Sequence, residues 1–297
     1  MLWGGQRTQA HMGTLISVTV ADENSSDEVF ELFADLDNKL STYKSDSEIS
    51  RLNRHFELNV SEVTGKILER SVEMYHISDG AFDVTVGSFT HQVYRFGYES
   101  EHIPSKGELH KAEHFVGSDR IDIEDGFVKV LPGTVIDLGG IGKGYAVDLA
   151  IDLLKKKGVT NAVVAASGDI GCLGQCTIEI QDPFHPNAHV ATLVSTLNRF
   201  AVSTSGNYER YIKNKTHNHL IDPKTGQSQQ RYASITLIDI GDNTRIDALA
   251  TAVSVMDEKR AVKMLHKLKI GYVLIRNDGS MVKSSITHGI LIQYRQD

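Results

Sequence analysis

Two spacings of apolar residues divide the chain into predicted helices and strands. Apolar residues three and four positions apart predict amphipathic helices, and short β-branched or apolar runs between Gly, Asn and Asp residues predict strands. The expected helices cover residues 28–40, 61–78, 145–154, 244–256 and 257–268. The expected strands cover residues 15–20, 120–123, 127–131, 134–136, 161–166, 175–181, 199–203, 232–240, 270–276 and 286–294.

The order of these elements favours an α+β fold over a doubly wound sheet. Helices and strands mix along the chain without strict βαβ alternation, so we expect mixed or antiparallel sheets with packed helices. Residues 1–11 are expected to be irregular, and the polar residues 97–118 are expected to form a surface insertion. Because the sequence has no internal repeat, low-complexity stretch or clear linker, we expect residues 1–297 to form a single domain.

Residues 136–148, with the sequence IDLGGIGKGYAVD, hold the most distinctive pattern. A β-branched run leads to Asp137, four glycines follow within eight residues, and an amphipathic helix comes next. Glycine N–H groups and a helix N-terminus can hold a phosphate, and Lys143 adds a full positive charge. The spacing matches neither a Rossmann G-x-G-x-x-G turn nor a Walker A loop, which needs Ser or Thr where Gly144 stands. A tight turn that packs a helix on a sheet fits the same glycines equally well.

Asp247 and Thr251 form a second candidate site, for a metal ion. They lie four residues apart on a predicted helix, so both side chains share one face. Carboxylate and hydroxyl oxygens suit a hard cation such as Mg²⁺. From the residues alone a structural alternative carries more weight, because Thr244-x-x-Asp247 matches a capping box. If this pair and the glycine turn converge, His219 is the natural general base, since imidazole titrates near neutral pH.

Composition narrows the classes of partner and compartment. With 40% hydrophobic and 23% charged residues, the chain has the make-up of a globular protein, and its net charge of −7 argues against a nucleic-acid partner, which needs a basic face. Neither a transmembrane segment nor a leader is visible, so a cytoplasmic location is expected as the sequence stands. A periplasmic, membrane-anchored lipoprotein is the alternative if a leader has been removed. Cys172 and Cys176 are expected to be ordinary thiols, because a zinc site or a disulfide scaffold needs more cysteines.

Taken together and in their order along the chain, the motifs resemble those of the ApbE family, the FAD:protein FMN transferases. The resemblance covers nearly the whole chain. Each motif alone is a weak signal, but their occurrence in the same order as in the family makes the resemblance specific. One departure lies in the turn at Ser167-Gly168, where the family has Gly-Gly. The matching segments are residues 12–14, 41–53, 80–87, 136–148, 167–171, 204–206, 219–226 and 247–251.

The resemblance implies a reaction and its substrates. The family moves the FMN half of FAD onto a Thr or Ser hydroxyl of an acceptor flavoprotein and releases AMP, with Mg²⁺ required. Some members hydrolyse FAD to FMN and AMP, so a Mg²⁺-dependent FAD pyrophosphatase is one alternative, and a non-catalytic flavin-binding protein is another. The residues do not separate transfer from hydrolysis, whereas retention of Asp247, Thr251 and His219 speaks against a non-catalytic protein.

The resemblance also implies roles for individual residues. His219 corresponds to the catalytic histidine of the family. The implied Mg²⁺ ligands are Asp247, Thr251 and main-chain oxygens near Gly140 and Ala250. The residues implied to line the FAD site are Met12, Tyr43, Ala81, Phe82, Asp83, Asp137, Lys143 and Ile221.

Overall fold

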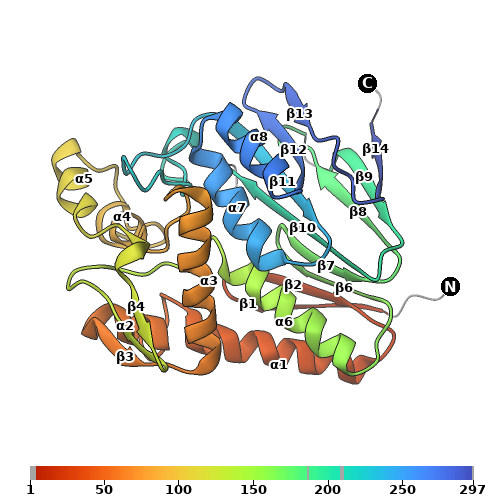
Figure 1. The fold of residues 1–297 in the computed structure, drawn as a ribbon, viewed down its shortest axis with the longest axis horizontal. Coiled ribbons are helices and arrows are strands. Elements are labelled where there is room, and N and C mark those ends of the chain that lie inside the picture. Colours follow the sequence, from red (N-terminus) through yellow and green to blue (C-terminus); the bar gives the residue numbers. More distant parts are fainter. Residues whose placement is uncertain (1–4, 186, 208–210, 296–297) are drawn as a thin grey trace.

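A large antiparallel sheet lies at the centre of the molecule in the computed structural model, which describes residues 5–185, 187–207 and 211–295 (Figure 1). Its strands are β1 (Gln6–His11), β2 (Thr14–Thr19), β6 (Ala162–Ala166), β7 (Asp169–Leu173), β10 (Arg199–Gly206), β11 (Tyr232–Asp239), β12 (Gly271–Arg276) and β13 (Met281–Lys283). Neighbouring strands follow the order β1-β2-β6-β7-β10-β11-β12-β13, and each of these pairs is antiparallel. With helices packed on such a sheet, the predicted α+β class is confirmed.

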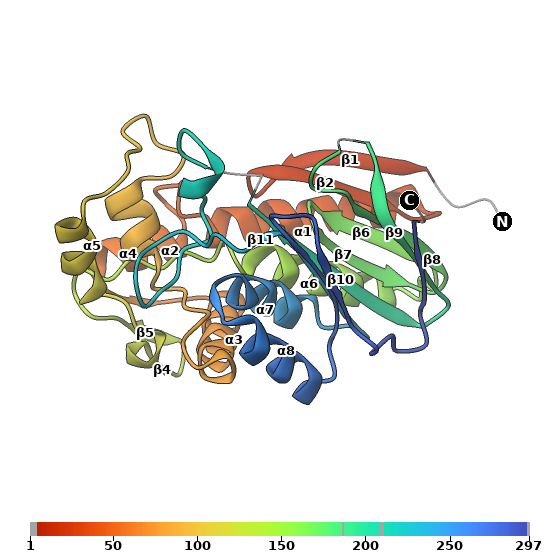
Figure 2. The ribbon, with the colours of Figure 1, turned by 90° about the horizontal axis from the view of Figure 1, so that it is seen from above.

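Helices cover one face of the large sheet, and a small sheet covers the other (Figure 2). The helices are α1 (Glu23–Leu40), α3 (Glu62–Ser78), α6 (Gly142–Lys156), α7 (Asn243–Val255) and α8 (Glu258–Lys267), and the strands of the small sheet are β8 (Cys176–Gln181), β9 (His189–Ser195) and β14 (Leu291–Tyr294). Helices α6 and α7 contact the large sheet directly, α1 packs against α6, and α3 packs against α7. Within the described parts of the chain, no helix is both long and apolar enough to cross a membrane.

The central strands are apolar on both faces and so serve two cores. In β11, Ile235 and Leu237 belong to the core beneath the helices, whereas Ile238 belongs to the core that faces the small sheet. In β12, Leu274 belongs to the core beneath the helices, and Val273 belongs to the core that faces the small sheet. Because successive side chains of a strand point to opposite faces, such a strand is buried on both sides, and every residue of β11 is buried.

A group of shorter elements lies beyond α3 (Figure 1, left). It contains α2 (Glu48–His55), β3 (Glu57–Asn59), α4 (Gly87–Phe89), the π-helix η1 (Thr90–Tyr94), α5 (Lys106–Glu113), η2 (Ser118–Arg120), β4 (Asp122–Glu124) and β5 (Phe127–Lys129), while η3 (Lys215–His217) lies in a later loop. Helix α5 begins at a capping box formed by Ser105 and Glu108, so the expected surface insertion at residues 97–118 contains a helix. Residues 6–11, expected to be irregular, form β1.

The strand expected at residues 134–136 is wrong, because polar side chains take the place of a partner strand. Val135 makes one isolated bridge, and its N–H donates to the hydroxyl of Ser88 at 3.1 Å. The side-chain amide of Asn53 accepts from the N–H of Ile136 at 2.7 Å and donates to the carbonyl of Ile136 at 3.0 Å. The segment is therefore extended and fixed in direction where it enters the glycine turn.

The expectation of two ordinary thiols is also wrong. Cys172 and Cys176 form a disulfide across the turn between β7 and β8. Gly174 in that turn has φ +69°, a conformation that glycine adopts readily, and the two Cα atoms lie 6.5 Å apart, within the range that a disulfide spans. The spacing of the two cysteines in the sequence carried no information about this turn.

Helices α6 and α7 approach each other closely because glycines lie at their contact. A Cβ atom on Gly144 would lie 2.7 Å from the Cβ of Asp247 and would collide with the carbonyl oxygen of Asn243. A Cβ atom on Gly140, just before α6, would lie 2.7 Å from Thr251 Oγ1. Gly140 contacts Thr251, Gly144 contacts Asp247, and Asp148 contacts Thr244. Because the residue numbers rise along α6 while they fall along α7, the two helices are antiparallel.

Replacing Gly144 by Ala should therefore destabilise the fold. The added methyl group overpacks the α6–α7 contact, which typically costs about 1–3 kcal/mol. Gly65→Ala in α3 is the matched control, because its Cβ would meet nothing closer than Val60 Cγ2 at 3.9 Å, and alanine favours a helix over glycine by up to about 1 kcal/mol. Thermal unfolding of both variants measures the difference. A Gly144→Ala protein as stable as Gly65→Ala would contradict the close contact.

Candidate active site

Asp137 stands at the entrance to the glycine turn and is held from several directions. Thr90 Oγ1 donates to its Oδ2 at 2.7 Å, His91 Nε2 lies 3.2 Å from the same oxygen, and the N–H of Gly139 donates to Oδ1 at 2.9 Å. The N–H of Asp137 donates to the carbonyl of Val84 at 2.7 Å. Burial alone would raise the pKa of Asp137, but His91 and these hydrogen bonds outweigh it and lower the pKa below its ordinary value. The turn therefore begins at a fixed, ionised carboxylate.

Lys143 lies in the first turn of α6 and reaches across to β7. Its Nζ lies 3.2 Å from Asp169 Oδ2 and 3.4 Å from the carbonyl oxygen of Gly139. Asp169 is only 2% exposed, and Ser203 Oγ donates to its Oδ1 at 2.6 Å. Sequence reasoning marked the small-residue turn at residues 167–171 but missed Asp169, the carboxylate in that turn that orients the lysine.

Several of the expected metal ligands meet between α6 and α7. The main chain at Gly140 lies against the hydroxyl of Thr251, as the position of a Cβ on Gly140 shows. The buried carboxylate of Asp247 accepts the N–H of Gly144 at 2.9 Å, and Ala250 is fully buried on the same helix. The structure brings Asp247 and Thr251 against the backbone of residues 140–144, and the role of all four residues as metal ligands stays a prediction.

The capping-box alternative for Asp247 does not describe the structure. The N-cap of α7 is Asp242, whose side chain accepts the N–H of Arg245 at 2.8 Å. Thr244 donates its N–H and its hydroxyl to Asp148, at 2.8 and 2.5 Å. Asp247 contacts the start of α6 instead, on the side of the glycine turn.

The donors gathered there fit a hard divalent cation. They are the carboxylate of Asp247 and the hydroxyl of Thr251, to which the resemblance adds main-chain carbonyls near Gly140 and Ala250, and all of them are oxygens. No group of three or more His, Cys, Asp or Glu side chains gathers in the part of the chain that the structure describes. A single carboxylate is nevertheless typical of Mg²⁺ sites in which phosphates of the substrate complete the coordination.

The other residues expected at the FAD site surround the glycine turn to different extents. Met12 lies beside it, since its Cε would be 3.6 Å from a Cβ on Gly142. Tyr43 is exposed, in the loop between α1 and α2. Ala81, Phe82 and Asp83 are buried after α3, and both carboxylate oxygens of Asp83 accept hydrogen bonds from Thr85 or Ser118. Burial raises the pKa of Asp83 despite these bonds, which lower it.

His219 and Ile221 lie on a hairpin that docks against η1. Ile221 is buried in an apolar cluster with residues of α4 and η1, and the hydroxyl of Tyr94 donates to the carbonyl of Gly226 at 2.9 Å. Asn218, beside His219, is fully buried, and its amide donates to the carbonyl of Gln229 at 2.8 Å. Thr90 and His91, which hold Asp137, belong to the same π-helix, so this helix links the hairpin to the glycine turn.

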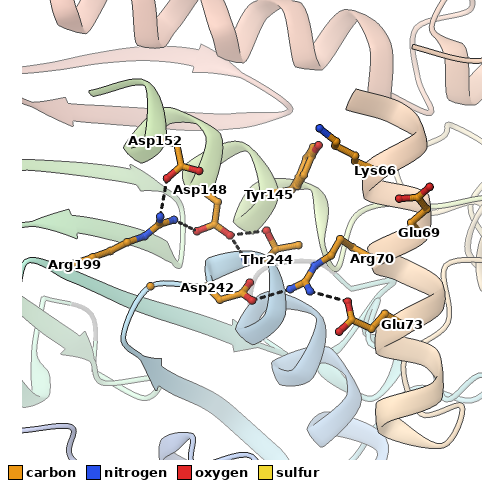
Figure 3. Close-up of a pocket in the computed structure, with 11 residues that line it drawn as sticks. Lys66, Glu69, Arg70, Glu73, Tyr145, Asp148, Asp152, Arg199, Asp242 and Thr244 are labelled. Carbon is orange, nitrogen blue, oxygen red and sulfur yellow. Dashed lines mark hydrogen bonds and ion pairs between the residues drawn. The ribbon is translucent and has the colours of Figure 1, made fainter. Parts of the chain in front are cut away.

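Two cavities lie outside these residues. One, of about 540 Å³, lies between the hairpin and the C-terminal end of α7 and is lined largely by polar side chains such as Gln227, Ser228 and Ser254. The other, of about 510 Å³, lies at the N-terminal end of α7 (Figure 3). Its ion pairs join Arg199 to Asp148 and Asp152, and Arg70 to Glu73 and Asp242. None of the expected site residues lines the second cavity, whose ion pairs hold α3, α6, α7 and β10 together.

Comparison with known proteins identifies the family. The sequence profile of the ApbE family matches residues 12–274. The chain belongs to the ApbE family. Among its relatives, the FAD:protein FMN transferase of Haemophilus influenzae is 31% identical over 290 residues, which cover 91% of this chain and 83% of the relative. The protein of the same name from Vibrio cholerae is 30% identical over 263 residues, covering 84% of this chain and 78% of the relative.

Solved ApbE structures share the fold over almost the whole chain. The ApbE protein of Thermotoga maritima has a TM-score of 0.87 at 28% identity, covering 96% of this chain and 97% of that chain. The flavin transferase ApbE from Vibrio cholerae has a TM-score of 0.84 at 27% identity, covering 97% of this chain and 99% of that chain. The antiparallel sheets and their helices are thus those of the ApbE fold.

This ApbE chain keeps the tight turn after β6 although Ser167 stands where the family motif has glycine. Ser167 has φ +57°, the left-handed conformation, which is uncommon but accessible to a residue other than glycine. Gly168 lies so close to the carbonyl oxygen of Thr204 that any side chain would collide, and its own carbonyl accepts the N–H of Thr204 at 2.9 Å. Glycine is therefore required at 168, and the turn still presents Asp169 to Lys143.

Thr90→Val should lower the stability of the folded protein by an amount that depends on pH. The variant loses one hydrogen bond to a charged group, a contribution of about 1.5–3 kcal/mol near neutral pH. The pKa of Asp137 is lowered in the folded state, so the stabilisation is present above the unfolded value of about 4 and is lost as the pH falls through the lower folded value. The difference in melting temperature from the wild type should therefore narrow below about pH 4.

The matched control is Thr134→Val, whose hydroxyl donates to the uncharged carbonyl of Phe115 at 3.1 Å. The decrease in melting temperature that Thr134→Val causes should not depend on the charge of Asp137. Melting temperatures of the three proteins, measured from neutral to acidic pH, make the comparison. If Thr90→Val lowered the melting temperature by the same amount at every pH, the hydroxyl of Thr90 would not be bonded to an ionised Asp137.

Proposed function

We propose that this chain is a Mg²⁺-dependent FAD:protein FMN transferase. In the proposed reaction, a Thr or Ser hydroxyl of an acceptor flavoprotein attacks the phosphorus of the FMN half of FAD. A phosphoester bond between FMN and the acceptor forms, a P–O bond of the diphosphate breaks, and AMP leaves. The relatives named FAD:protein FMN transferase, which match most of the length of both chains, support this class of reaction.

The observation that carries the proposal is the contact between the glycine turn and α7. The glycine-rich backbone at residues 139–144 lies beside the carboxylate of Asp247 and the hydroxyl of Thr251, and we propose that this backbone binds phosphate. The N-terminus of α6 and the ammonium group of Lys143 would bind the negative diphosphate. When bound, Mg²⁺ would supply charge neutralisation at the diphosphate oxygens.

His219 is the proposed general base for the acceptor hydroxyl. It is partly exposed, and Leu220 and Asn218 on either side are buried, so the backbone holds its position. The polar cavity of about 540 Å³ beside this hairpin gives room for a segment of the acceptor. Because the proposed site draws on residues from Met12 to Thr251, we also propose that the whole chain works as one domain.

Incubation of the protein with FAD, Mg²⁺ and a candidate acceptor should add one FMN to the acceptor for each AMP released. His219→Ala should bind FAD nearly as well but transfer FMN about 10²–10⁴-fold more slowly, the usual contribution of a general base. The matched control is His217→Ala, two residues away in η3, which should retain activity. Mass spectrometry of the acceptor and chromatography of AMP give the two readouts.

The same experiment separates the alternatives. AMP release at an equal rate without acceptor would identify an FAD pyrophosphatase, in which water takes the place of the hydroxyl. FAD binding with no AMP under any condition would identify a non-catalytic flavin-binding protein.

Asp247→Asn should abolish most AMP release while leaving the protein folded. Asparagine keeps a carbonyl oxygen that can accept the N–H of Gly144, but it removes the charge that would attract Mg²⁺. Excess Mg²⁺ or Mn²⁺ should restore part of the activity. Asp148→Asn is the matched control, since this carboxylate joins the middle of α6 to the start of α7 and should affect melting temperature rather than the Mg²⁺ requirement. A folded Asp247→Asn protein with wild-type turnover in limiting Mg²⁺ would remove Asp247 from the metal site.

A further inference from the structure

The segment that carries His219 differs in charge from the rest of the chain. Residues 211–231 form a double hairpin, in which one isolated bridge closes each half. The double hairpin has one acidic residue, Asp222, and four basic residues, which are Lys213, Lys215, Lys224 and Arg231. Its net charge is therefore +3, with histidines neutral, in a chain whose net charge is −7. A basic surface thus adjoins the proposed general base, although the chain as a whole is acidic.

Three of these basic side chains, Lys213, Lys215 and Lys224, are not neutralised by a neighbouring carboxylate. All three are exposed, and in the described parts of the chain none of them forms an ion pair. Exposed lysines elsewhere do form such pairs; Lys66, for example, pairs with Glu62 in α3. The positive charges of the double hairpin are therefore open to a partner with negative charge.

Buried contacts hold the double hairpin in a fixed position. Ile212 is buried in the apolar cluster that contains residues of α4 and η1. Asn218 is fully buried, and its amide donates to the carbonyls of Lys215 and Gln229, at 2.8 Å each. Because Asn218 directly precedes His219, a group bound at Lys215 would take a fixed position relative to this histidine.

The polar cavity of about 540 Å³ is continuous with this basic surface. The side-chain amide of Gln230, which lines the cavity, donates to the carbonyl of Thr216 in η3 at 2.7 Å. Arg231 also lines the cavity and donates to the carbonyl of Met256 at 3.4 Å. Most of the other lining side chains are amides and hydroxyls, which can donate to and accept from a peptide main chain. The cavity suits a segment of polypeptide, and the lysines beside it suit a polypeptide with acidic side chains.

We propose that Lys213, Lys215 and Lys224 form a docking surface for an acidic segment of the acceptor protein, next to the residue that receives FMN. The inference rests on the proposed function, because it takes the acceptor as the partner. Charge complementarity selects this partner. The net negative charge of the rest of the chain repels an acidic protein, whereas the double hairpin attracts it, so the attraction also orients the acceptor toward His219. The lysines add affinity and orientation but no chemical step.

Two other anionic partners fit this surface less well. Within residues 211–231, all of which the structure describes, Tyr211 is the only large apolar side chain that is exposed, which leaves little to insert into a membrane. The diphosphate of FAD is assigned to the glycine turn in the proposed function, where Lys143 and the N-terminus of α6 supply positive charge. Both partners are distinguished from the acceptor by the experiment below.

The test measures FMN transfer by the full chain to an acceptor that the wild type modifies. The acceptor is varied at saturating FAD, and FAD is then varied at saturating acceptor. The variants are Lys213→Gln/Lys215→Gln, Lys213→Arg/Lys215→Arg and Lys224→Gln. The matched control is Lys155→Gln/Lys156→Gln, which removes the same charge from exposed positions at the C-terminal end of α6, away from the glycine turn. Hexaglutamate, with hexalysine as its control, is the probe for the docking surface itself, and melting temperatures establish that each variant is folded.

Lys213→Gln/Lys215→Gln should raise the KM for the acceptor about 2- to 30-fold, the range for loss of two exposed ion pairs. The kcat and the KM for FAD should stay near the wild-type values, because these lysines touch neither the phosphorus nor the acceptor hydroxyl. Arginine at both positions should restore the KM, since it keeps the charge. In about 1 M salt the variant and the wild type should become alike, which a merely structural role does not predict. Hexaglutamate should compete with the acceptor in the wild type and inhibit the variant less.

An acceptor KM in Lys213→Gln/Lys215→Gln equal to that of the control, with transfer by the wild type intact, would overturn the docking surface and leave the proposed function standing. So would a variant that raises the KM for FAD alone, or one that loses only its sedimentation with phosphatidylglycerol vesicles. A wild type that transfers FMN to no acceptor would overturn both proposals. If Lys213→Gln/Lys215→Gln did not fold, Lys224→Gln would decide, with an expected increase in the acceptor KM of about 1.4- to 5-fold that disappears in high salt.

Discussion

The contact between the glycine turn and α7 is the constraint on which the rest of the molecule depends. Two backbone segments come this close only where no side chain separates them, and Gly140 and Gly144 meet that condition opposite Thr251 and Asp247. A larger residue at either glycine would move the hydroxyl and the carboxylate away from the backbone that is proposed to bind phosphate. The packing of the helices and the assembly of the proposed site are one geometric requirement, so enlarging either glycine should reduce stability and activity together.

At the N-terminal end of α7, hydrogen bonds and ion pairs add to the close packing. Asp148 of α6 accepts hydrogen bonds from the first residues of α7 and pairs with Arg199, while Arg70 of α3 reaches Asp242 at the N-cap of α7. Carboxylates are favoured at this position because the helix dipole places partial positive charge there. The contact of α6 with α7 thus combines close packing at Gly140 and Gly144 with the hydrogen bonds and ion pairs of Asp148, one turn further along α6.

The sequence predicted those features that depend on neighbours in the chain. Apolar periodicity located α6 and α7, and the glycines after Asp137 indicated the tight turn that precedes α6. His91 and Asp169 could not be found in this way, because each matters through a partner that approaches only in the fold. The strand expected at residues 134–136 failed for the same reason, since Asn53, remote in the sequence, takes the hydrogen bonds that a neighbouring strand would make.

Because β2 pairs with β6, the chain cannot complete its large sheet early in synthesis. Ile16 lies opposite Ala166, so the amino-terminal hairpin has no partner strand until the middle of the chain has left the ribosome. The core beneath the helices also includes residues from later in the chain, as far as Leu274. Such non-local pairing slows folding and leaves a strand edge open in the nascent chain, where it can pair with other chains. A fragment that ended before α7 would have neither a closed core nor the side chains of Asp247 and Thr251, which are proposed to bind the metal.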